Sequence, residues 1–392
     1  MKFFVILVTF YFVIQKTASI SYTVYDSDPN EVYEFEERQP KFYYPYEYAR
    51  NLELDAKAQE FAGKIQFKYY KNNVNLLNSN AAVYDRVEEA GCSVHEKFAF
   101  ILHGWRQDCD NTDWVTQLRE KLTTYRGGCI ICIDYSPYSS DSYFRLMRNF
   151  NPIMTAITDK IKDFAAQGFQ PQINGYIFGH SFGGQLASAI GRQFYEAQFK
   201  NIDICDMAGP GFDVLGVVDH RNAAQNVQCI HTSYDKGTRL YNCHQNFRMG
   251  NCGLSQVAAR EPPFGSHGLC TYMYVSAFEN NFFAVDKPPK CTSVNPAKNV
   301  PKHFRMGYQE NRISNITGEF FVPTSKTSPY NVFIDSNFNM TRYLIENDDH
   351  RADNAYTLLE ARHRLSILSN SLSKVKKFLR QKLRTMVRVQ FV

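Results

Sequence analysis

The 392-residue sequence has no apolar run long enough to cross a bilayer. A membrane-spanning helix needs about 20 consecutive apolar residues, and the longest run here, Phe3–Ile14, is shorter. Lys2 precedes this run, and the small residues of Thr17–Ser19 follow it. A basic start, a short apolar segment and small residues are typical of a secretory signal peptide, which we place at residues 1–19. We therefore expect a soluble, secreted, extracellular chain.

A strong charge bias is missing as well. The chain has 44 Lys and Arg against 39 Asp and Glu, which gives a net charge of +5, and 21% of its residues are charged. With 44% hydrophobic residues, this is an ordinary globular composition that can bury a large core. We expect no nucleic-acid partner.

No cysteine has to remain unpaired, because the chain has ten cysteines, an even number. In an exported protein an even count favours disulfides over thiolate metal ligands. Cys129 and Cys132 have the C-x-x-C spacing, but they lie in an apolar run that indicates a buried strand, so we expect neither a redox site nor a zinc site. Glycosylation sequons at Asn315 and Asn339 agree with a secretory route.

Composition divides the chain into four parts. After the predicted signal, residues 20–58 are dense in Tyr, Glu and Asp and have no helical or strand period. Such a stretch favours a solvated lead, with a pro-segment or an arm folded over the body as the alternative. We place a globular domain at residues 59–335, beginning with the alternating strand Lys64–Lys71, and a basic tail at residues 336–392.

Strand and helix patterns alternate through this domain. They are, in order, the strand Lys97–Leu102, a helix from Trp114, the strand Cys129–Tyr135, a helix from Tyr143 to Ala166 with a kink before Pro152, the strand Ile173–Phe178, a helix to Phe199 and the strand Asn201–Asp206. Such alternation predicts an α/β fold with a mainly parallel sheet and helices on both faces. Ligands bind at the carboxyl ends of the strands in these sheets.

The most informative stretch is the turn Gly179–Gly183, which has Ser181 at its centre. A predicted strand comes directly before it, and a helical pattern with Leu186, Ile190 and Phe194 at every fourth position comes directly after it. A G-x-S-x-G pattern can occur by chance, but this context is that of the nucleophile elbow of an α/β-hydrolase. Ser181 is therefore the candidate nucleophile.

A serine nucleophile needs a base, and the base needs a carboxylate to orient it. In α/β-hydrolases the order along the chain is Ser, then Asp or Glu, then His. Asp206 ends the next strand-like run, where the strand gives way to a Gly/Pro turn. Asp203, Asp213 and Asp219 are the competing carboxylates, which we interpret as solvated or structural.

Within the predicted domain, the histidines that follow Asp206 are His220, His231, His244, His267 and His303. His231 lies in a predicted core strand and would be a buried histidine whose hydrogen bonds are satisfied. His267 lies in a Gly/Pro-rich loop directly before a Tyr-rich helical run, and loop placement suits a base that must reach the serine. Spacing alone does not decide between the two.

Several separated motifs carry a resemblance to a known family. HGW, GHSFGG, ICDMAGPGF, VQCIHT, CHQNF and GSHGLCTYMYVSAFEN follow one another in the family's order, and the likeness covers about Ile65 to Tyr330. The chain resembles the animal pancreatic-type lipases, which include insect and venom phospholipases A1. The resemblance implies an α/β-hydrolase fold.

The same resemblance implies roles for five residues. Ser181 matches the nucleophile, Asp206 the acid and His267 the base of the catalytic triad. The backbone N–H groups of Trp105 and Phe182 match the oxyanion hole. The chemistry of such a site requires no metal and no organic cofactor.

The chain also departs from the family's pattern around the lid. The cysteine that usually precedes the catalytic Ser-His is replaced by Gly265, and Cys270 follows the histidine instead. From the resemblance we expect Cys252 to pair with Cys270 and a short lid at about Gly253–Phe264. A short lid resembles the phospholipase A1 members, and there is no room for the C-terminal domain that binds colipase, so no colipase partner is expected.

The tail carries most of the positive charge. Residues 360–392 contain nine Lys or Arg and one acidic residue, beside an apolar seam with steps of three and four. We expect an amphipathic helix that contacts anionic lipid or a polyanion, with a helix packed on the body as the alternative.

These observations together predict a secreted carboxylic ester hydrolase of the lipase or phospholipase A1 type. Its substrate would be lipid at a membrane or lipid-droplet surface. The alternative is a secreted lipid-binding, storage or eggshell protein that keeps a lipase-like domain with little turnover.

Overall fold

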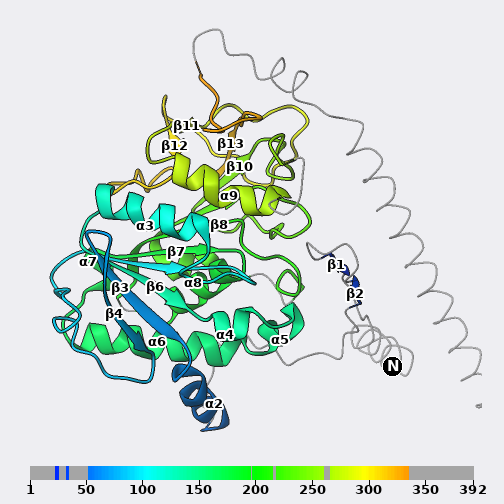
Figure 1. The fold of residues 1–392 in the computed structure, drawn as a ribbon. Coiled ribbons are helices and arrows are strands. Elements are labelled where there is room, and N and C mark those ends of the chain that lie inside the picture. The colour runs from blue at the N-terminus through cyan, green and yellow to red at the C-terminus, as the bar shows by residue number, and fades with distance from the viewer. Residues whose placement is uncertain are drawn as a thin grey trace, which may run out of the picture. The chain divides into compact units, whose positions relative to one another are not determined.

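The computed structural model describes residues 23–25, 32–34, 52–195, 197–214, 218–259 and 265–334 (Figure 1). The chain divides into two compact units, Met1–Met340 and Thr341–Val392, and the second lies wholly outside the described residues. The predicted signal peptide, the sequon at Asn339 and the basic tail therefore remain sequence predictions.

A nine-stranded sheet forms the centre of the first unit, in the order β13-β10-β9-β8-β7-β5-β6-β3-β4. Its strands are β3 (Gln66–Lys71), β4 (Val74–Asn80), β5 (Phe98–Leu102), β6 (Cys129–Asp134), β7 (Gly175–His180), β8 (Phe199–Cys205), β9 (Ala224–His231), β10 (Gln245–Met249) and β13 (Gly318–Val322). All neighbouring strands from β6 to β13 are parallel, and β3 is antiparallel to both β6 and β4. This is the α/β-hydrolase fold, and the predicted mainly parallel sheet is confirmed.

Helices cover both faces of the sheet (Figure 1). They are α2 (Leu52–Ala62), α3 (Asp113–Tyr125), α4 (Ser136–Ser139), α5 (Tyr143–Arg148), α6 (Phe150–Ala166), α7 (Pro171–Asn174), α8 (Phe182–Arg192) and α9 (Gly265–Ser276), with a 3-10 turn at His220–Ala223. Helices α3 and α9 lie on one face, and α6 and α8 lie on the other. Two short antiparallel pairs, β1 (Thr23–Tyr25) with β2 (Val32–Glu34) and β11 (Phe282–Phe283) with β12 (Arg305–Met306), are separate from this sheet.

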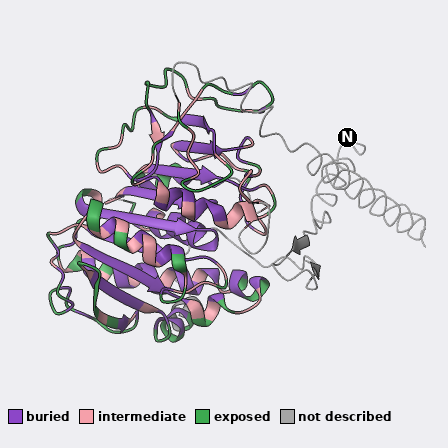
Figure 2. Ribbon diagram, turned by 45° about the horizontal axis from the view of Figure 1, so that its top comes forward, coloured by how far each residue is buried: buried purple, intermediate pink, exposed green. Residues whose placement is uncertain are grey.

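The core is split by the sheet into two apolar layers. Along β5, Phe98, Phe100 and Leu102 pack under α6 and α8, whereas Ala99 and Ile101 face the α3 and α9 side. Because side chains alternate along a strand, a central strand that is covered on both faces is apolar throughout. Figure 2 shows the central strands buried along their length.

Two sequence predictions about elements need correction, and a third is confirmed. The helix after the elbow ends at Arg192, and Phe199 begins β8 rather than ending that helix. The arm before the domain is not without regular structure, since β1, β2 and α2 lie in or overlap it. Helix α2 exists because Ala58, Phe61 and Ala62 are buried on one side of it, next to α6. The predicted break in the helix before Pro152 is present at Asn149, between α5 and α6.

All ten cysteines form disulfides. The pairs are Cys92–Cys129, Cys109–Cys132, Cys205–Cys270, Cys229–Cys243 and Cys252–Cys291. The expected pair of Cys252 with Cys270 is wrong. Cys270 lies in α9 on the sheet side and meets the end of β8, whereas Cys252 packs with Cys291 and Phe321 in a separate small cluster.

Among the described helices, none has the length and apolar character needed to span a membrane.

Candidate active site

Ser181 occupies a sharp turn between β7 and α8. Its backbone has φ of 57° and ψ of −122°, a combination that L-residues rarely adopt. The turn requires glycine on both sides, because a Cβ on Gly179 would lie 2.4 Å from the Gly183 carbonyl oxygen and one on Gly183 would lie 2.3 Å from that of His103. The strand, turn and helix thus hold the Ser181 hydroxyl at the carboxyl edge of the sheet, at the N-terminus of α8.

The structure brings Ser181, His267 and Asp206 into one chain of hydrogen bonds. His267 Nε2 lies 2.8 Å from Ser181 Oγ, and His267 Nδ1 lies 2.6 Å from Asp206 Oδ2. A carboxylate at Nδ1 requires that this nitrogen carries the proton, which leaves Nε2 to accept the hydrogen of the serine hydroxyl. The arrangement can therefore remove a proton from Ser181.

Asp206 is fully buried, and its charge is held by hydrogen bonds. Oδ1 accepts the backbone N–H groups of Thr232 at 2.7 Å and Ser233 at 3.1 Å, and Oδ2 accepts the Ser233 hydroxyl in addition to His267. Burial by itself raises the pKa of this carboxyl, but the hydrogen bonds from His267, Ser233 and Thr232 outweigh it and hold the pKa below its usual value. Asp206 is thus a carboxylate at neutral pH.

His267 is not in a loop as the sequence indicated, but in the first turn of α9. A second histidine, His180, lies beside it, with the two ring centroids 4.9 Å apart. Burial and then the charge of His267 lower the pKa of His180 to about 3, so His180 is neutral in the folded protein. No second positive charge therefore competes with the one that His267 gains when it accepts a proton.

The backbone N–H groups of Trp105 and Phe182 are available as donors. Within the described parts of the chain neither of them has a hydrogen-bond acceptor, whereas the N–H groups of the neighbouring residues Arg106 and Gly184 donate to backbone oxygens. Phe182 follows Ser181 directly, and a Cβ on Gly104, the residue before Trp105, would lie 3.2 Å from Ser181 Cβ. Both donors thus belong to segments that meet at the serine.

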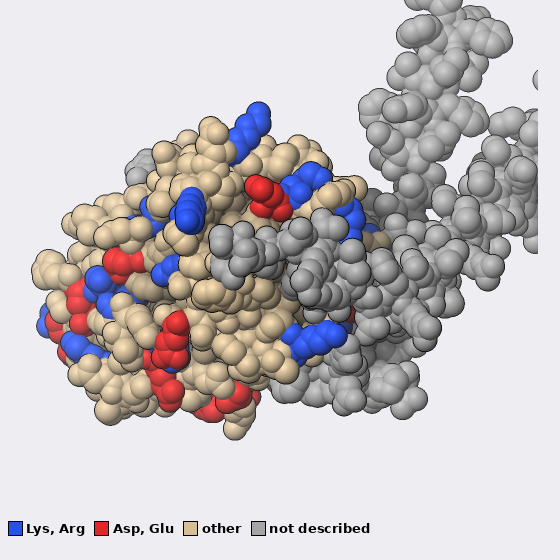
Figure 3. Space-filling model, turned by 90° about the horizontal axis from the view of Figure 1, so that it is seen from above, with Lys and Arg blue, Asp and Glu red and all other residues tan. Residues whose placement is uncertain are grey.

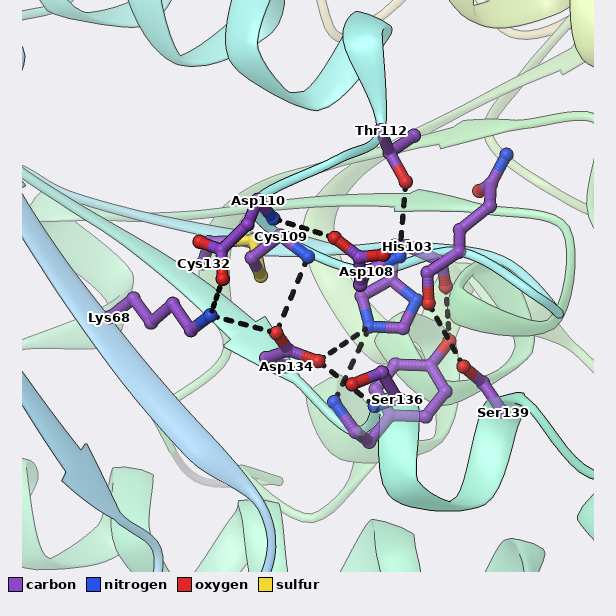
Figure 4. Close-up of polar contacts among 12 residues, drawn as sticks. Lys68, His103, Asp108, Cys109, Asp110, Thr112, Cys132, Asp134, Ser136 and Ser139 are labelled. Carbon is purple, nitrogen blue, oxygen red and sulfur yellow. Dashed lines mark hydrogen bonds and ion pairs between the residues drawn. A yellow bond between two sulfur atoms is a disulfide. The ribbon is translucent and has the colours of Figure 1, made fainter.

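A cluster of polar residues, most of them buried, supports the segment that carries Trp105 (Figure 4). Lys68 lies 2.5 Å from Asp110 and 3.0 Å from Asp134, and Asp134 lies 3.6 Å from His103 Nε2. The Tyr135 ring stacks on the His103 ring at 4.2 Å. Burial raises the pKa of Asp134, but the neighbouring His103 and the hydrogen bond from Ser136 lower it well below the usual range, so the carboxylate stays charged. Together with the Cys109–Cys132 disulfide, these contacts fix the loop between β5 and α3.

The competing residues have other partners. Asp203 is fully buried against Arg312, at 2.6 Å, and the Tyr274 hydroxyl. Asp213 accepts from Thr238 at 2.6 Å, and Asp219 accepts from Arg221.

Among the competing histidines, His231 is buried in β9, where Nε2 lies 3.4 Å from Asn246, and burial lowers its pKa to about 4. His220 is likewise buried, against Ser188 at 2.6 Å. His244 lies 3.1 Å from the backbone nitrogen of Val227.

Comparison with known proteins decides the family. The family model described as Lipase matches residues 34–252, which is more than half of the chain.

The chain belongs to the lipase family. Phospholipase A1 member A of Bos taurus is similar to it, with 23% identity over 216 residues that cover 53% of this chain and 46% of the relative. Lipase member H of Mus musculus is 24% identical over 266 residues, covering 61% of this chain and 58% of the relative. Pancreatic lipase-related protein 2 of Bos taurus is 27% identical over 144 residues, covering 36% of this chain and 30% of the relative. The chain spans about half of the length of the phospholipase A1 member A and lipase member H relatives that it matches.

Solved structures similar to this lipase-family chain include Est1E from Butyrivibrio proteoclasticus, at 15% identity and a TM-score of 0.24, covering 42% of this chain and 76% of that chain. Another is a predicted CIB-like hydrolase from Thermoplasma acidophilum, at 16% identity and a TM-score of 0.24, covering 34% and 61%.

Sequence reasoning missed two polar residues at the site of this lipase-family chain, Ser233 and His180. Ser233 was open to prediction, because it comes two residues after the apolar end of β9, and the carboxyl ends of parallel strands meet at one edge. The position of the His180 ring could not be predicted, since it depends on how α9 packs against β7.

Seen from above in Figure 3, the described surface carries basic and acidic side chains that are interspersed, without a stripe of one sign. On sequence grounds, a concentrated positive charge is expected in the tail.

Proposed function

We propose that this protein hydrolyses the carboxylic ester bonds of lipids through a covalent acyl-enzyme. The observation that supports this most strongly is the unbroken hydrogen-bond chain from Ser181 Oγ through His267 to Asp206, with distances of 2.8 and 2.6 Å. Membership of the lipase family supports lipid as the substrate class. Five disulfides agree with the proposed secretion of the chain.

In the proposed reaction, Ser181 Oγ attacks the ester carbonyl carbon while His267 Nε2 takes the hydroxyl proton. The N–H groups of Trp105 and Phe182 stabilise the negative charge that develops on the carbonyl oxygen. His267 then gives its proton to the leaving alcohol, and Asp206 stabilises the imidazolium throughout. A water molecule repeats the sequence on the acyl-enzyme and releases the fatty acid. Every proton in this scheme moves between Ser181, His267, substrate and water, so the scheme needs no cofactor.

For the substrate class we propose phospholipid before triacylglycerol. The segment expected as the lid, residues 253–264, is short, and its last five residues lie outside the described part of the chain. A short lid offers little apolar surface to an aggregate of neutral lipid, and relatives named Phospholipase A1 member A are among the similar proteins. Lipid at a membrane surface is the expected partner.

The test is hydrolysis of phosphatidylcholine and of triolein by wild type, Ser181→Ala and Ser188→Ala. Ser188 is a matched control, because it is a buried serine on the same helix and its hydroxyl contacts His220 and Arg192. We expect Ser181→Ala to lose at least about 10⁴-fold in kcat and Ser188→Ala to keep a kcat close to that of wild type. We also expect the wild-type protein to hydrolyse phosphatidylcholine faster than triolein.

The alternative function is lipid binding or storage without turnover. It is favoured by the differences from the family's pattern around the lid, where Gly265 replaces the cysteine that usually precedes the catalytic Ser-His. It predicts that wild type and Ser181→Ala bind lipid equally and that neither releases fatty acid. Turnover that Ser181→Ala abolishes would exclude it.

A further inference from the structure

Cys205 is linked to all three residues of the hydrogen-bond chain, to Ser181 and Asp206 directly and to His267 through Cys270. Its carbonyl oxygen accepts the backbone N–H of Ser181 at 3.1 Å, and its peptide bond continues directly into Asp206. Its sulfur is bonded to Cys270, which lies three residues after His267 in α9. No other described disulfide has a cysteine next to, or within one helical turn of, a member of the chain.

His267 needs such an anchor because of where it lies in its helix. Helix α9 begins at Gly265, so His267 is in the first turn, where backbone N–H groups have no acceptor within the helix and where helices fray. Besides the hydrogen bonds of the His267 ring to Ser181 and Asp206, two described contacts help to hold this turn. The Ser266 hydroxyl accepts from Gln256 N at 2.9 Å, and the His267 carbonyl lies 3.4 Å from His180 Nε2. Cys270 is completely buried one turn later.

Asp206 needs such an anchor as well, because of its backbone conformation. This residue has a positive φ of 41°, so the chain leaves β8 in a conformation that a residue other than glycine adopts only when its surroundings impose it. The disulfide fixes the residue directly before this bend, Cys205, to the helix that carries the base.

We propose that the Cys205–Cys270 disulfide is a positioning element for the reaction, which keeps the Asp206 carboxylate and the His267 ring at bonding distance. The proposal rests on the proposed function of the triad. It assigns to this bond a role that the other four disulfides lack: it joins the acid strand to the base helix, where a displacement of about 1 Å can lower the rate of an enzymatic reaction about 100-fold.

The experiment compares Cys205→Ala/Cys270→Ala with Cys92→Ala/Cys129→Ala. The control bond is buried too, but Cys129 begins β6 and so lies at the amino edge of the parallel strands, away from Ser181. The Cys205–Cys270 bond joins residues 65 apart in the sequence, and the control bond joins residues 37 apart. In the chain-entropy model the stabilisation by a disulfide grows only with the logarithm of the length of the loop it closes, so the two bonds contribute similar amounts. The two variants should therefore lose similar stability.

We expect Cys205→Ala/Cys270→Ala to lose roughly 10- to 100-fold in kcat with KM within about twofold, at a temperature where circular dichroism shows it folded. The control variant should keep kcat within about twofold of wild type. Equal kcat in the two folded variants would overturn the proposal. If the first variant does not fold, Cys205→Val/Cys270→Ala, which restores apolar volume without the bond, takes its place. Failure of both to fold while the control folds would assign the bond to stability and overturn the positioning role.

A second measurement does not depend on turnover. The His267 Nδ1 proton that is shared with Asp206 should give a low-field proton resonance, and this signal should weaken or vanish in Cys205→Ala/Cys270→Ala but persist in the control.

A double-mutant cycle adds a kinetic check. In an Asp206→Asn background, removal of the disulfide should lower kcat less than threefold, because the alignment of Asp206 and His267 that the disulfide maintains is already lost. If removal of the disulfide lowered kcat as much in the Asp206→Asn background as in wild type, the proposal would be contradicted.

These results separate the inference from the proposed function. If wild type hydrolyses no lipid ester and Ser181→Ala equals wild type, the proposed function fails. If wild type is active, Ser181→Ala is inactive and the disulfide variant retains full kcat and the low-field signal, only the inference fails.

Discussion

The peptide group between Gly104 and Trp105 is held at its carbonyl oxygen. His103 Nδ1 lies 3.0 Å from this oxygen, and the Gln107 N–H donates to it at 3.3 Å. A carbonyl oxygen cannot donate, so His103 Nδ1 must carry the proton. Because the C=O and N–H of a trans peptide point in opposite directions, this hydrogen bond also sets the direction of the Trp105 N–H.

Two substitutions at His103 test this arrangement. Asparagine places an N–H donor as many bonds from Cα as Nδ1 is, whereas glutamine places it one bond further. We expect His103→Asn to keep kcat within about 10-fold of wild type and His103→Gln to lose about 100-fold, which is the effect of losing one oxyanion donor. Steady-state kinetics on a soluble ester would measure both. Equal values for two folded variants would show that Nδ1 does not orient the peptide.

Buried histidines make the stability of the fold depend on pH. Burial lowers the pKa of His180 and His220 to about 3 and that of His231 to about 4, from 6.5. Below pH 6.5 the unfolded chain therefore binds protons that the folded protein does not, and the free energy of unfolding falls as the pH falls. Each such histidine contributes a slope of up to about 1.4 kcal/mol per pH unit.

His231→Gln isolates one of these contributions. We expect the free energy of unfolding, measured by urea titration between pH 4 and 6.5, to fall less steeply with decreasing pH in this variant than in wild type. The slope is the readout, because the substitution also changes stability at every pH. An unchanged slope would mean that His231 already takes up a proton in the folded state.

At the scale of elements, burial decided what the sequence could predict. β5, β6 and β7 are covered on both faces, so their apolar runs were evident. β4 is an edge strand with a largely exposed, Asn-rich sequence, and no hydrophobic period indicates it. The start of α9 was placed too late because Gly265 and His267, which read as loop residues, lie in its first turn.

A buried carboxylate on β8, Asp203, forms an ion pair with Arg312 and a hydrogen bond with α9. Asp203 on β8 accepts from Arg312 and from Tyr274 of α9, and both ionic side chains are almost fully buried. Loss of one partner leaves a buried charge unpaired, so we expect Arg312→Met to lower the free energy of unfolding by about 3–5 kcal/mol. The double variant Asp203→Asn/Arg312→Met should recover part of this loss.

The exposed pair Arg221–Asp219 provides the control for this prediction. Its side chains are 55% and 38% exposed, and surface pairs contribute about 0–1 kcal/mol. Arg221→Met should therefore have a small effect in the same denaturant titration. Similar losses for Arg312→Met and Arg221→Met would contradict the account of the buried pair.

For the molecule as a whole, the sequence allowed the order of strands and helices and the location of the site to be predicted, because the motifs at Ser181 and Asp206 mark strand ends. The disulfide pairing could not be predicted. Cys205 and Cys270 are 65 residues apart, and their contact depends on how α9 lies across β8. The proposed division into an arm, a domain at residues 59–335 and a tail remains a prediction.

The basic tail lies outside the described residues, and its role is predicted from charge alone. Residues 360–392 hold nine Lys or Arg against one acidic residue. We expect deletion of residues 361–392 to weaken binding to anionic vesicles at low salt, because a basic amphipathic segment is attracted to anionic lipid. Co-sedimentation with vesicles would measure this, and neutral vesicles are the control. Unchanged binding would remove the proposed role.

The most direct test of the central claim is covalent labelling of the folded protein with a fluorophosphonate, followed by intact mass and peptide mapping. We expect one label per chain, on Ser181, with Ser188 unmodified. We also expect His267→Gln to slow labelling by about 1,000-fold or more, because the base that activates the hydroxyl is lost. A folded wild-type protein that stays unlabelled, or one labelled at another residue, would contradict the assignment of Ser181 as the nucleophile.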